Sequence, residues 1–303
     1  MDDEFPDSGE FPEKTTLVKW ADGPTVMPEV RADIVYQELS GEKQHIQLLI
    51  PSQAPDKRDV EPPKYPLIVF IQGSAWLRQN VWEGLDKALA AVEKGFAFAL
   101  VEYRPSDVAP FPAQIEDAKS AIRFLRLHVD EYGIDTKKVA IWGNSSGGHT
   151  AVMVGLTGDG LLDNGQYGDV TCAVDCVVDW YGPTDISLMN YYPSAKDHRE
   201  PDSPEGLLIG RKNVLDSPEI TQKVNPMNYV SADKQIPPFL IMHGSKDEIV
   251  PFNQSVRLYD KLRENDKDVT FYKVDGGKHF GPGGFNSSEA KEVSLAFIEK
   301  YLK

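Results

Sequence analysis

Residues 142–149 read Trp-Gly-Asn-Ser-Ser-Gly-Gly-His (WGNSSGGH), directly after the apolar run KVAI. A Gly-x-Ser-x-Gly pattern at a strand-to-helix junction predicts a nucleophile elbow, a sharp turn that lifts one serine hydroxyl above the sheet. The glycines are needed because side chains there would collide with the neighbouring strand and helix. The spacing selects Ser145, which lies between Gly143 and Gly147, whereas Ser146 has Asn144 in place of the first glycine. Ser145 is therefore the predicted nucleophile.

The chain around this stretch alternates between apolar runs and amphipathic patterns. The apolar runs predict buried strands, and they lie at residues 67–71, 96–102, 138–142, 172–179, 239–243 and 269–274. The amphipathic patterns predict helices, and they lie at residues 84–94, 111–132, 147–157, 253–265 and 287–302. This alternation predicts one α/β domain, a mostly parallel sheet with helices on both faces.

Three further segments complete the predicted organisation. Residues 1–28 are rich in Asp, Glu and Pro and predict a loose acidic arm ahead of a domain at 29–303. Residues 29–39 and 45–50 predict an antiparallel hairpin. Residues 186–237, dense in Pro, Asp, Ser and Tyr, interrupt the α/β alternation. Insertions of that size usually carry function or cover a site, so we interpret this one as a cap or lid.

The composition narrows the classes of partner. The chain has 47 acidic and 32 basic residues and a formal charge of −15, a balance that repels nucleic acid and anionic membranes. The N-terminal residues lack the basic and apolar regions of a secretory signal. No run approaches the roughly 18 apolar residues of a membrane helix. We therefore expect a cytoplasmic protein without nucleic-acid or membrane partners.

The two cysteines, Cys172 and Cys176, predict free buried thiols. Four positions apart in one strand, their Cα atoms would be separated by about 13 Å, which is beyond the reach of a disulfide. With no partner His or Cys nearby, the pair predicts no metal site.

A serine nucleophile needs a base, and the base needs a group that holds its tautomer. In α/β domains that carry a nucleophile elbow, the catalytic residues follow one another along the chain in the order serine, acid, histidine. Asp247 and His279 each follow one of the last two predicted strands, so both are expected at the edge of the sheet where ligands bind. Ser145, Asp247 and His279 form the predicted triad, with Glu248 and Asp275 as alternatives for the acid.

Two other histidines lie near the predicted site. His149 follows Ser145 by one helical turn and is expected to pack or to form a hydrogen bond. His243 ends a strand and is expected to support the loop that carries the acid.

The oxyanion of an acyl-transfer intermediate needs main-chain N–H donors. Ser146 opens the helix after the nucleophile, so its N–H is one predicted donor. Gly73 and Ser74 follow the strand at 67–71, where esterases place such a loop, and are the other predicted donors. An ordinary strand-to-helix loop is the alternative for this segment.

Aromatic side chains near these loops are candidates for the walls of a substrate cleft, because rings offer flat faces to a sugar or a phenolic acyl group. Core or lid packing is the alternative for each of them. The candidates are Trp76, Trp82, Trp180 and Tyr181, together with Tyr191 and Tyr192 in the insertion.

These features together resemble the α/β-hydrolase superfamily, and within it the hormone-sensitive-lipase-like carboxylesterases of the bacterial feruloyl and acetyl-xylan esterase branch. The chain departs from that branch at Gln72 and Ser74, where such esterases place a His-Gly pair. The resemblance is carried by the segments IQGSAW, VEYRPS, GNSSGGH, DWYGPTDI, SPEGLLIG and PPFLIMHGSKDEIVPF.

The resemblance implies an eight-stranded sheet and an esterase without metal or cofactor. Its implied substrates are short-chain or aromatic esters, acetyl or feruloyl, of plant carbohydrate fragments, and it leaves a homodimer open. Arg104 and Asp117 match positions that are structural in such enzymes. Two alternatives stay open. One is a serine peptidase of the prolyl-oligopeptidase type, whose usual propeller domain has no room here, and the other is a non-catalytic receptor, which typically loses the base histidine.

Overall fold

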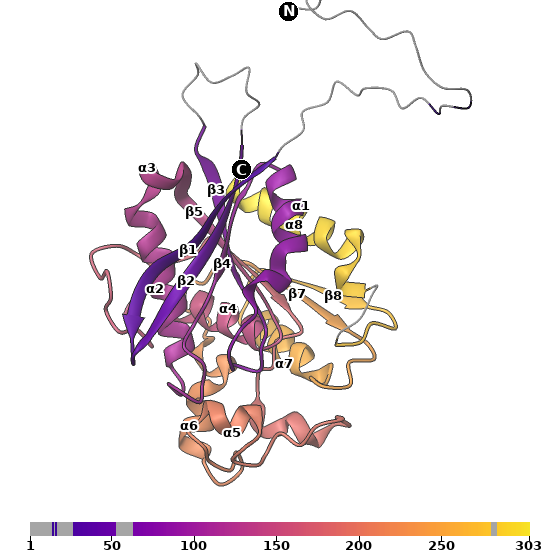
Figure 1. Cartoon of the computed structure of the whole chain (residues 1–303). Coiled ribbons are helices and arrows are strands. Elements are labelled where there is room, and N and C mark those ends of the chain that lie inside the picture. The colour runs from indigo at the N-terminus through magenta and orange to yellow at the C-terminus, as the bar shows by residue number, and fades with distance from the viewer. Residues whose placement is uncertain (1–13, 15, 17–26, 53–62, 280–283) are drawn as a thin grey trace, which may run out of the picture.

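The computed structural model describes residues 14, 16, 27–52, 63–279 and 284–303, so the predicted arm at 1–28 lies almost wholly outside the described residues. An eight-stranded sheet runs through the molecule in the order β1-β2-β4-β3-β5-β6-β7-β8 (Figure 1). Only β2 opposes the direction of the other strands in this sheet. The predicted mostly parallel, eight-stranded sheet is confirmed.

The strands follow the predicted apolar runs. β4, β6 and β7 are buried at every position, as a sheet covered on both faces requires. The predicted hairpin is present as β1 and β2. The bounds are β1 Pro28–Leu39, β2 Glu42–Pro51, β3 Tyr65–Ile71, β4 Ala97–Val101, β5 Ile134–Asn144, β6 Cys176–Trp180, β7 Phe239–Gly244 and β8 Val269–Val274.

One strand starts later than predicted. β6 begins at Cys176, so Cys172 lies in the preceding loop, where its N–H donates to Asp159 Oδ1 at 2.8 Å. Both thiols are free and buried. The loop geometry arises because the side chain of Asp159 satisfies a backbone donor that a strand would have paired.

The helices cover both faces of the sheet. α1 and α8 pack on one face, and α2, α4 and α7 on the other (Figure 1). The predicted helix at 111–132 is interrupted at His128, between α2 and α3. The bounds are α1 Leu85–Glu93, α2 Ala113–Leu127, α3 Val129–Tyr132, α4 Ser146–Thr157, α5 Pro204–Leu208, α6 Pro218–Val224, α7 Asn253–Glu264 and α8 Ser288–Leu302, with the 3-10 turns η2 Val81–Gly84, η3 Ile186–Tyr191, η4 Pro226–Tyr229 and η5 Gly284–Asn286.

The insertion at 186–237 lies between β6 and β7 and contains η3, α5, α6 and η4. Figure 1 shows α5 and α6 beyond the end of the sheet, below α4. Val224 and Val230 of the insertion are buried in the same core cluster as Val152 of α4. The insertion is therefore anchored to the helix that follows the predicted nucleophile.

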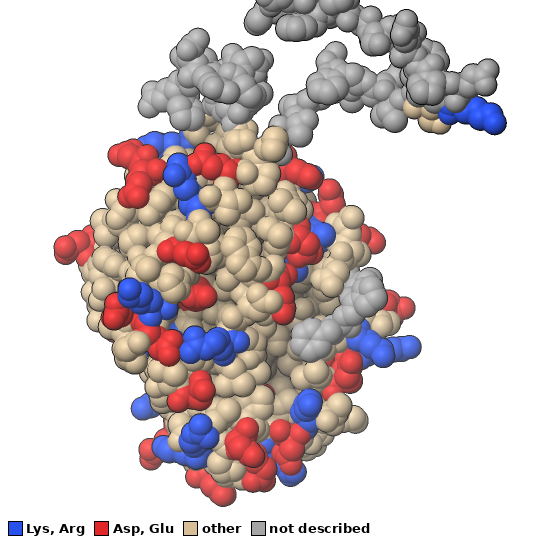
Figure 2. Space-filling view, viewed as in Figure 1, with Lys and Arg blue, Asp and Glu red and all other residues tan. Residues whose placement is uncertain are grey.

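One face of the molecule is of mixed charge. On the face shown in Figure 2, acidic and basic side chains are interspersed, so this face offers no single-sign field to a polyanion. None of the described helices combines the length and the apolar character that a bilayer crossing requires.

A buried ion pair ties the hairpin and α2 to the end of β4. Asp117 is fully buried, and its Oδ1 accepts hydrogen bonds from Arg104 Nη2 at 2.8 Å and Gln37 Nε2 at 2.6 Å. Its Oδ2 accepts from the backbone N–H of Arg104 at 2.7 Å. The contacts agree with the structural role that the resemblance implies for Arg104 and Asp117.

Replacing Asp117 by Asn should remove the fully buried carboxylate of the Arg104 pair and leave the guanidinium only Glu116, at 3.3 Å, as a charge partner. We expect the free energy of unfolding to fall by about 3–5 kcal/mol, measured by urea denaturation. Asp197→Asn, at the exposed pair with Arg199, is the matched control and should change stability little. Equal denaturation midpoints for the two variants would contradict the assignment.

Candidate active site

The predicted elbow is present between β5 and α4. Ser145 has φ 52° and ψ −129°, and its N–H donates to Trp180 O at 2.8 Å. A Cβ at Gly143 would lie 2.1 Å from Gly147 O, and a Cβ at Gly147 would lie 2.0 Å from Ile71 O. Both glycines are therefore required by close backbone contact.

Ser145, His279 and Asp247 lie in one chain of hydrogen bonds. Ser145 Oγ is 3.0 Å from His279 Nε2, and His279 Nδ1 is 2.8 Å from Asp247 Oδ2. His279 is 2% and Asp247 9% exposed, whereas Ser145 is half-buried. The structure thus brings the three predicted residues together, beyond the carboxyl ends of β5, β7 and β8, with the serine side accessible.

Asp247 is held as a carboxylate acceptor. Its Oδ1 accepts the backbone N–H groups of Ile249 and Val250, both at 2.9 Å. Burial alone would raise the pKa of Asp247, but the hydrogen bonds from His243 and His279 outweigh it and lower the pKa to about 2. Because an ionised carboxylate only accepts, His279 Nδ1 donates to it and Nε2 is left to accept the Ser145 proton.

The two alternative acids lie elsewhere. Glu248 is exposed, and its Oε2 accepts from the main-chain N–H of His279 at 3.4 Å. The side chain of Asp275 is 90% exposed and pairs with Lys273 at 3.4 Å. Asp247 is therefore the acid in contact with the imidazole ring.

His243 lies where its place in the sequence predicts. Its Nδ1 is 2.7 Å from Ser255 Oγ, and its Nε2 is 3.0 Å from Val250 O. The ring is fully buried and also lies 3.2 Å from Asp247 Oδ2. His243 therefore contacts both Asp247 and Val250 and supports the loop that carries the acid.

The structure corrects the predicted oxyanion donors. The Gly73 N–H donates to Asn144 Oδ1 at 3.1 Å, and the Ser74 N–H donates to Ser146 Oγ at 2.9 Å. A Cβ at Gly73 would lie 2.7 Å from Ser145 Cβ, so the loop does flank the nucleophile. Its first two amides, however, already have partners.

The amide that sequence reasoning missed belongs to Ala75. Within the described residues its N–H has no hydrogen-bond partner. Ala75 and Trp76 are consecutive non-glycine residues with φ of 57° and 56°, a conformation that the sequence does not signal. Ser146 is the first residue of α4, and the N–H groups of a first helical turn have no intrahelical acceptor.

Three of the six predicted aromatic walls are buried. Trp76, Trp180 and Tyr181 are 1%, 0% and 4% exposed. Trp180 Nε1 donates to Ser294 Oγ at 3.0 Å, under α8. The prediction of an open cleft wall is wrong for these three, because their rings fill the layers between sheet and helices.

The other aromatic candidates are accessible. Trp82 is 41% and Tyr191 77% exposed, and the ring of Tyr192 contacts that of Tyr191 at 5.3 Å. Tyr181 instead packs its ring edge-on against His279 with 4.8 Å between centroids. Its buried ring therefore supports the imidazole.

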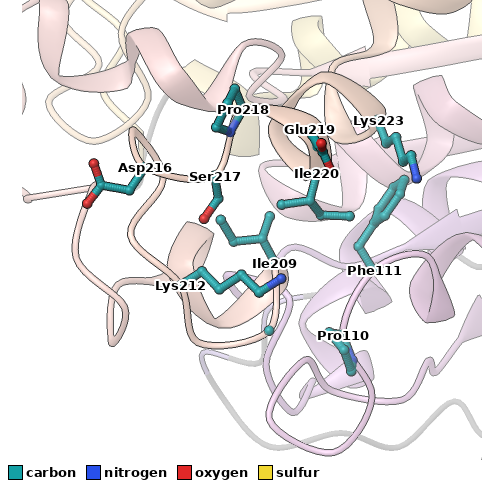
Figure 3. Close-up of a pocket in the computed structure, with 11 residues that line it drawn as sticks. Pro110, Phe111, Ile209, Lys212, Asp216, Ser217, Pro218, Glu219, Ile220 and Lys223 are labelled. Atoms are coloured by element: carbon teal, nitrogen blue, oxygen red, sulfur yellow. The ribbon is translucent and has the colours of Figure 1, made fainter.

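A cavity of about 680 Å³ opens beside the insertion. Figure 3 shows it between the segment of Pro110 and Phe111 and the segments at 209–212 and 216–223. Its one aromatic lining residue is Phe111, and none of the three hydrogen-bonded residues lines it. It is distinct from the predicted aromatic cleft.

One cluster of two carboxylates and a thiol has the spacing of a possible metal site. Asp159, Asp163 and Cys172 hold their ligand atoms within 4.8 Å of one another. Arg123 already occupies the position of a cation, with Nη2 3.1 Å from Asp159 and 2.6 Å from Asp163. This group fits a guanidinium clamp that closes the 159–172 loop better than a metal ion.

The BD-FAE family model matches residues 55–262. The chain belongs to the BD-FAE family. The predicted resemblance to α/β-hydrolase carboxylesterases is thereby confirmed, and two similar solved structures are named as esterases.

Several known proteins are similar to this chain in sequence or structure. A truncated carbohydrate esterase from gut microbiota is 30% identical with a TM-score of 0.77, over 93% of this chain and 98% of that chain. Esterase LipC of Mycobacterium tuberculosis is 27% identical over 74% of this chain and 55% of its own length. The chain spans about half the length of the first curated relatives that it matches. An esterase of Thermogutta terrifontis, 21% identical with a TM-score of 0.70 over 90% of this chain and 94% of that chain, shares the fold.

A second carboxyl lies beside the elbow of this BD-FAE protein. Asp179 is fully buried at the end of β6, and a Cβ at Gly148 would lie 2.4 Å from its Oδ1. Oδ1 accepts the Gly182 N–H at 2.9 Å, while Oδ2 has no hydrogen-bond partner among the described residues. Burial raises the pKa of Asp179 from 3.8 to about 7.

Asp179→Asn should therefore change how stability depends on pH. The folded wild type holds a proton that the unfolded chain releases, so its free energy of unfolding falls as pH rises from about 4 to about 7. The Asn variant has no titrating carboxyl at this position, so its free energy of unfolding does not fall for this reason. We expect it to gain stability relative to wild type between pH 5 and pH 8, by roughly 1–4 kcal/mol, measured by urea denaturation at both pH values. A variant-to-wild-type difference that is the same at both pH values would contradict the raised pKa.

Proposed function

We propose that this protein is a serine carboxylesterase that hydrolyses acetyl or feruloyl esters of carbohydrate fragments through an acyl-enzyme. One observation carries the proposal: Ser145 Oγ, on a strained elbow, lies 3.0 Å from an imidazole whose other nitrogen is 2.8 Å from a carboxylate. That arrangement activates a hydroxyl for attack on a carbonyl carbon. The membership in an esterase family supports it.

The mechanism follows from these atoms. His279 Nε2 takes the proton of Ser145 Oγ as the oxygen attacks the ester carbonyl, and Asp247 stabilises the imidazolium that forms. The imidazolium then protonates the leaving alcohol. Water repeats the sequence on the acyl-enzyme, releasing the acid and restoring Ser145.

The oxyanion needs donors that have no other partner in the resting site. We assign the N–H group of Ser146, which was a predicted donor, and that of Ala75, which takes the place of Gly73 in the predicted set. Ser74 contributes its N–H only if it releases Ser146 Oγ. The assignment rests on the contact between Gly73 and the nucleophile and on the unpaired state of Ala75 within the described chain.

The carbohydrate part of the proposal rests on the relatives and on the surface. A gut-microbiota protein similar to this chain over most of its length is named as a carbohydrate esterase. An endo-1,4-beta-xylanase B of Butyrivibrio fibrisolvens is 25% identical over 71% of this chain and 32% of its own length. The exposed rings of Trp82 and Tyr191 offer flat faces to a sugar. The non-catalytic alternative is disfavoured because His279 is retained and bonded to Ser145.

Ser145→Ala should lower turnover of p-nitrophenyl acetate by at least about 10³-fold, because no other group can form the acyl-enzyme. It should also abolish covalent labelling by a fluorophosphonate. Ser146→Ala keeps the main-chain N–H and is expected to keep the labelling. Wild-type turnover by the Ser145 variant, or loss of labelling in the Ser146 variant alone, would show that the nucleophile is misassigned.

A panel of esters tests the substrate class. The p-nitrophenyl esters of acetic and ferulic acid should be hydrolysed with higher kcat/KM than those of long fatty acids, since a carbohydrate esterase has no need of a lipid cleft. A feruloylated arabinose oligosaccharide should also be hydrolysed. Steady-state kinetics on matched leaving groups provides the comparison. A clear preference for long acyl chains would overturn the carbohydrate part and leave the esterase mechanism standing.

A further inference from the structure

His149 joins three segments that meet behind the elbow. It lies in the first turn of α4 and is fully buried. Its Nδ1 is 3.3 Å from Trp76 Nε1, in the loop after β3. Its Nε2 is 2.9 Å from Val224 O, at the last residue of α6 in the insertion. One imidazole therefore bridges the nucleophile helix, the predicted oxyanion loop and the insertion.

The partners determine the protonation of this ring. An indole N–H only donates and a carbonyl oxygen only accepts, so Nδ1 must accept from Trp76 and Nε2 must donate to Val224. The ring is therefore neutral, with its proton on Nε2. Burial lowers the pKa of His149 to about 4, which is consistent with that geometry.

The segment held by this bridge is strained. Ala75 and Trp76 both have positive φ, and such residues persist only where their surroundings hold them. The Trp76 side chain is 1% exposed and stands edge-on against the His149 ring, with 5.3 Å between centroids and 86° between planes. The Trp76 carbonyl accepts the Ser106 N–H at 2.8 Å. Indole and carbonyl together anchor the residue that follows the Ala75 amide.

We propose that His149 is a positioning residue: through the Trp76 indole it holds the Ala75 N–H where the oxyanion forms, and the Val224 carbonyl of α6 orients it for that role. The insertion thus contributes to the reaction without touching the substrate. This inference rests on the proposed esterase function and on Ala75 as a donor. An amide displaced by about 1 Å at such a site costs on the order of 10²-fold in rate.

The test compares four variants by steady-state turnover of p-nitrophenyl acetate and by titration of active sites with a fluorophosphonate. His149→Leu removes both hydrogen bonds, and Trp76→Phe removes the indole donor and part of the ring volume while it keeps an aromatic side chain. His149→Gln keeps one acceptor and one donor. Thr150→Val is the matched control, because Thr150 is equally buried on the same helix and its Oγ1 donates within that helix, to Ser146 O at 3.0 Å.

His149→Leu and Trp76→Phe should each lower kcat by about 10- to 100-fold, with KM within about threefold of wild type and with one titratable site per chain. His149→Gln should recover most of the lost rate, and Thr150→Val should stay close to wild type. Full stoichiometry separates a displaced amide from a partly unfolded sample. If His149→Leu does not fold, the kcat of Trp76→Phe tests the proposal.

Two results overturn the inference while the proposed function stands: Trp76→Phe within twofold of wild-type kcat, or Thr150→Val as impaired as His149→Leu. A wild-type protein that neither hydrolyses the ester nor reacts with the fluorophosphonate would instead refute the proposed function.

Discussion

The contact of three backbones at the elbow is the constraint on which the site depends. Ser145 adopts φ 52°, which is costly for a residue with a side chain. Gly147 touches Ile71 O of β3, and Gly143 of β5 touches Gly147. Helix α4 can begin there only because β3 and β5 are paired neighbours. The sheet order, the start of the helix and the exposure of one hydroxyl are therefore parts of the same packing solution.

The two carboxyls around the elbow are held in opposite states by their surroundings. Asp247 receives four hydrogen bonds, from two histidines and two main-chain amides, and these overcome the cost of burial. Asp179 is more deeply buried and, among the described residues, receives one hydrogen bond, from Gly182, so burial prevails. Titratable groups driven apart in this way mark acid and base roles in enzymes. Here Asp247 is suited to stabilise a cation, whereas burial raises the pKa of Asp179 so that it keeps its proton until the pH approaches 7.

The sequence was sufficient to predict the sheet and the Ser145, Asp247 and His279 constellation for a physical reason. Close packing demands the glycines at fixed spacing around Ser145, and parallel strands place every following loop at one edge. The sequence was insufficient to predict that the Trp180 side chain is buried, because this depends on which helical layer the side chains at the end of β6 face. It also placed the oxyanion donor at Gly73 and not at Ala75, because the Gly73 amide is engaged by Asn144, which lies 71 positions further along the chain.

The position of His149 follows from local sequence, but its hydrogen-bond partners do not. Helical spacing places it one turn from Ser145, but its partners Trp76 and Val224 are 73 and 75 positions away. A buried imidazole with two one-way partners has a single satisfactory tautomer, and changing any of the three groups leaves an unpaired polar atom in the core. Such a bridge resists small displacements more than apolar packing does, because a hydrogen bond weakens with angle as well as with distance. A strained amide beside a nucleophile needs that kind of support, which explains why a polar side chain occupies a position where packing alone would favour a leucine.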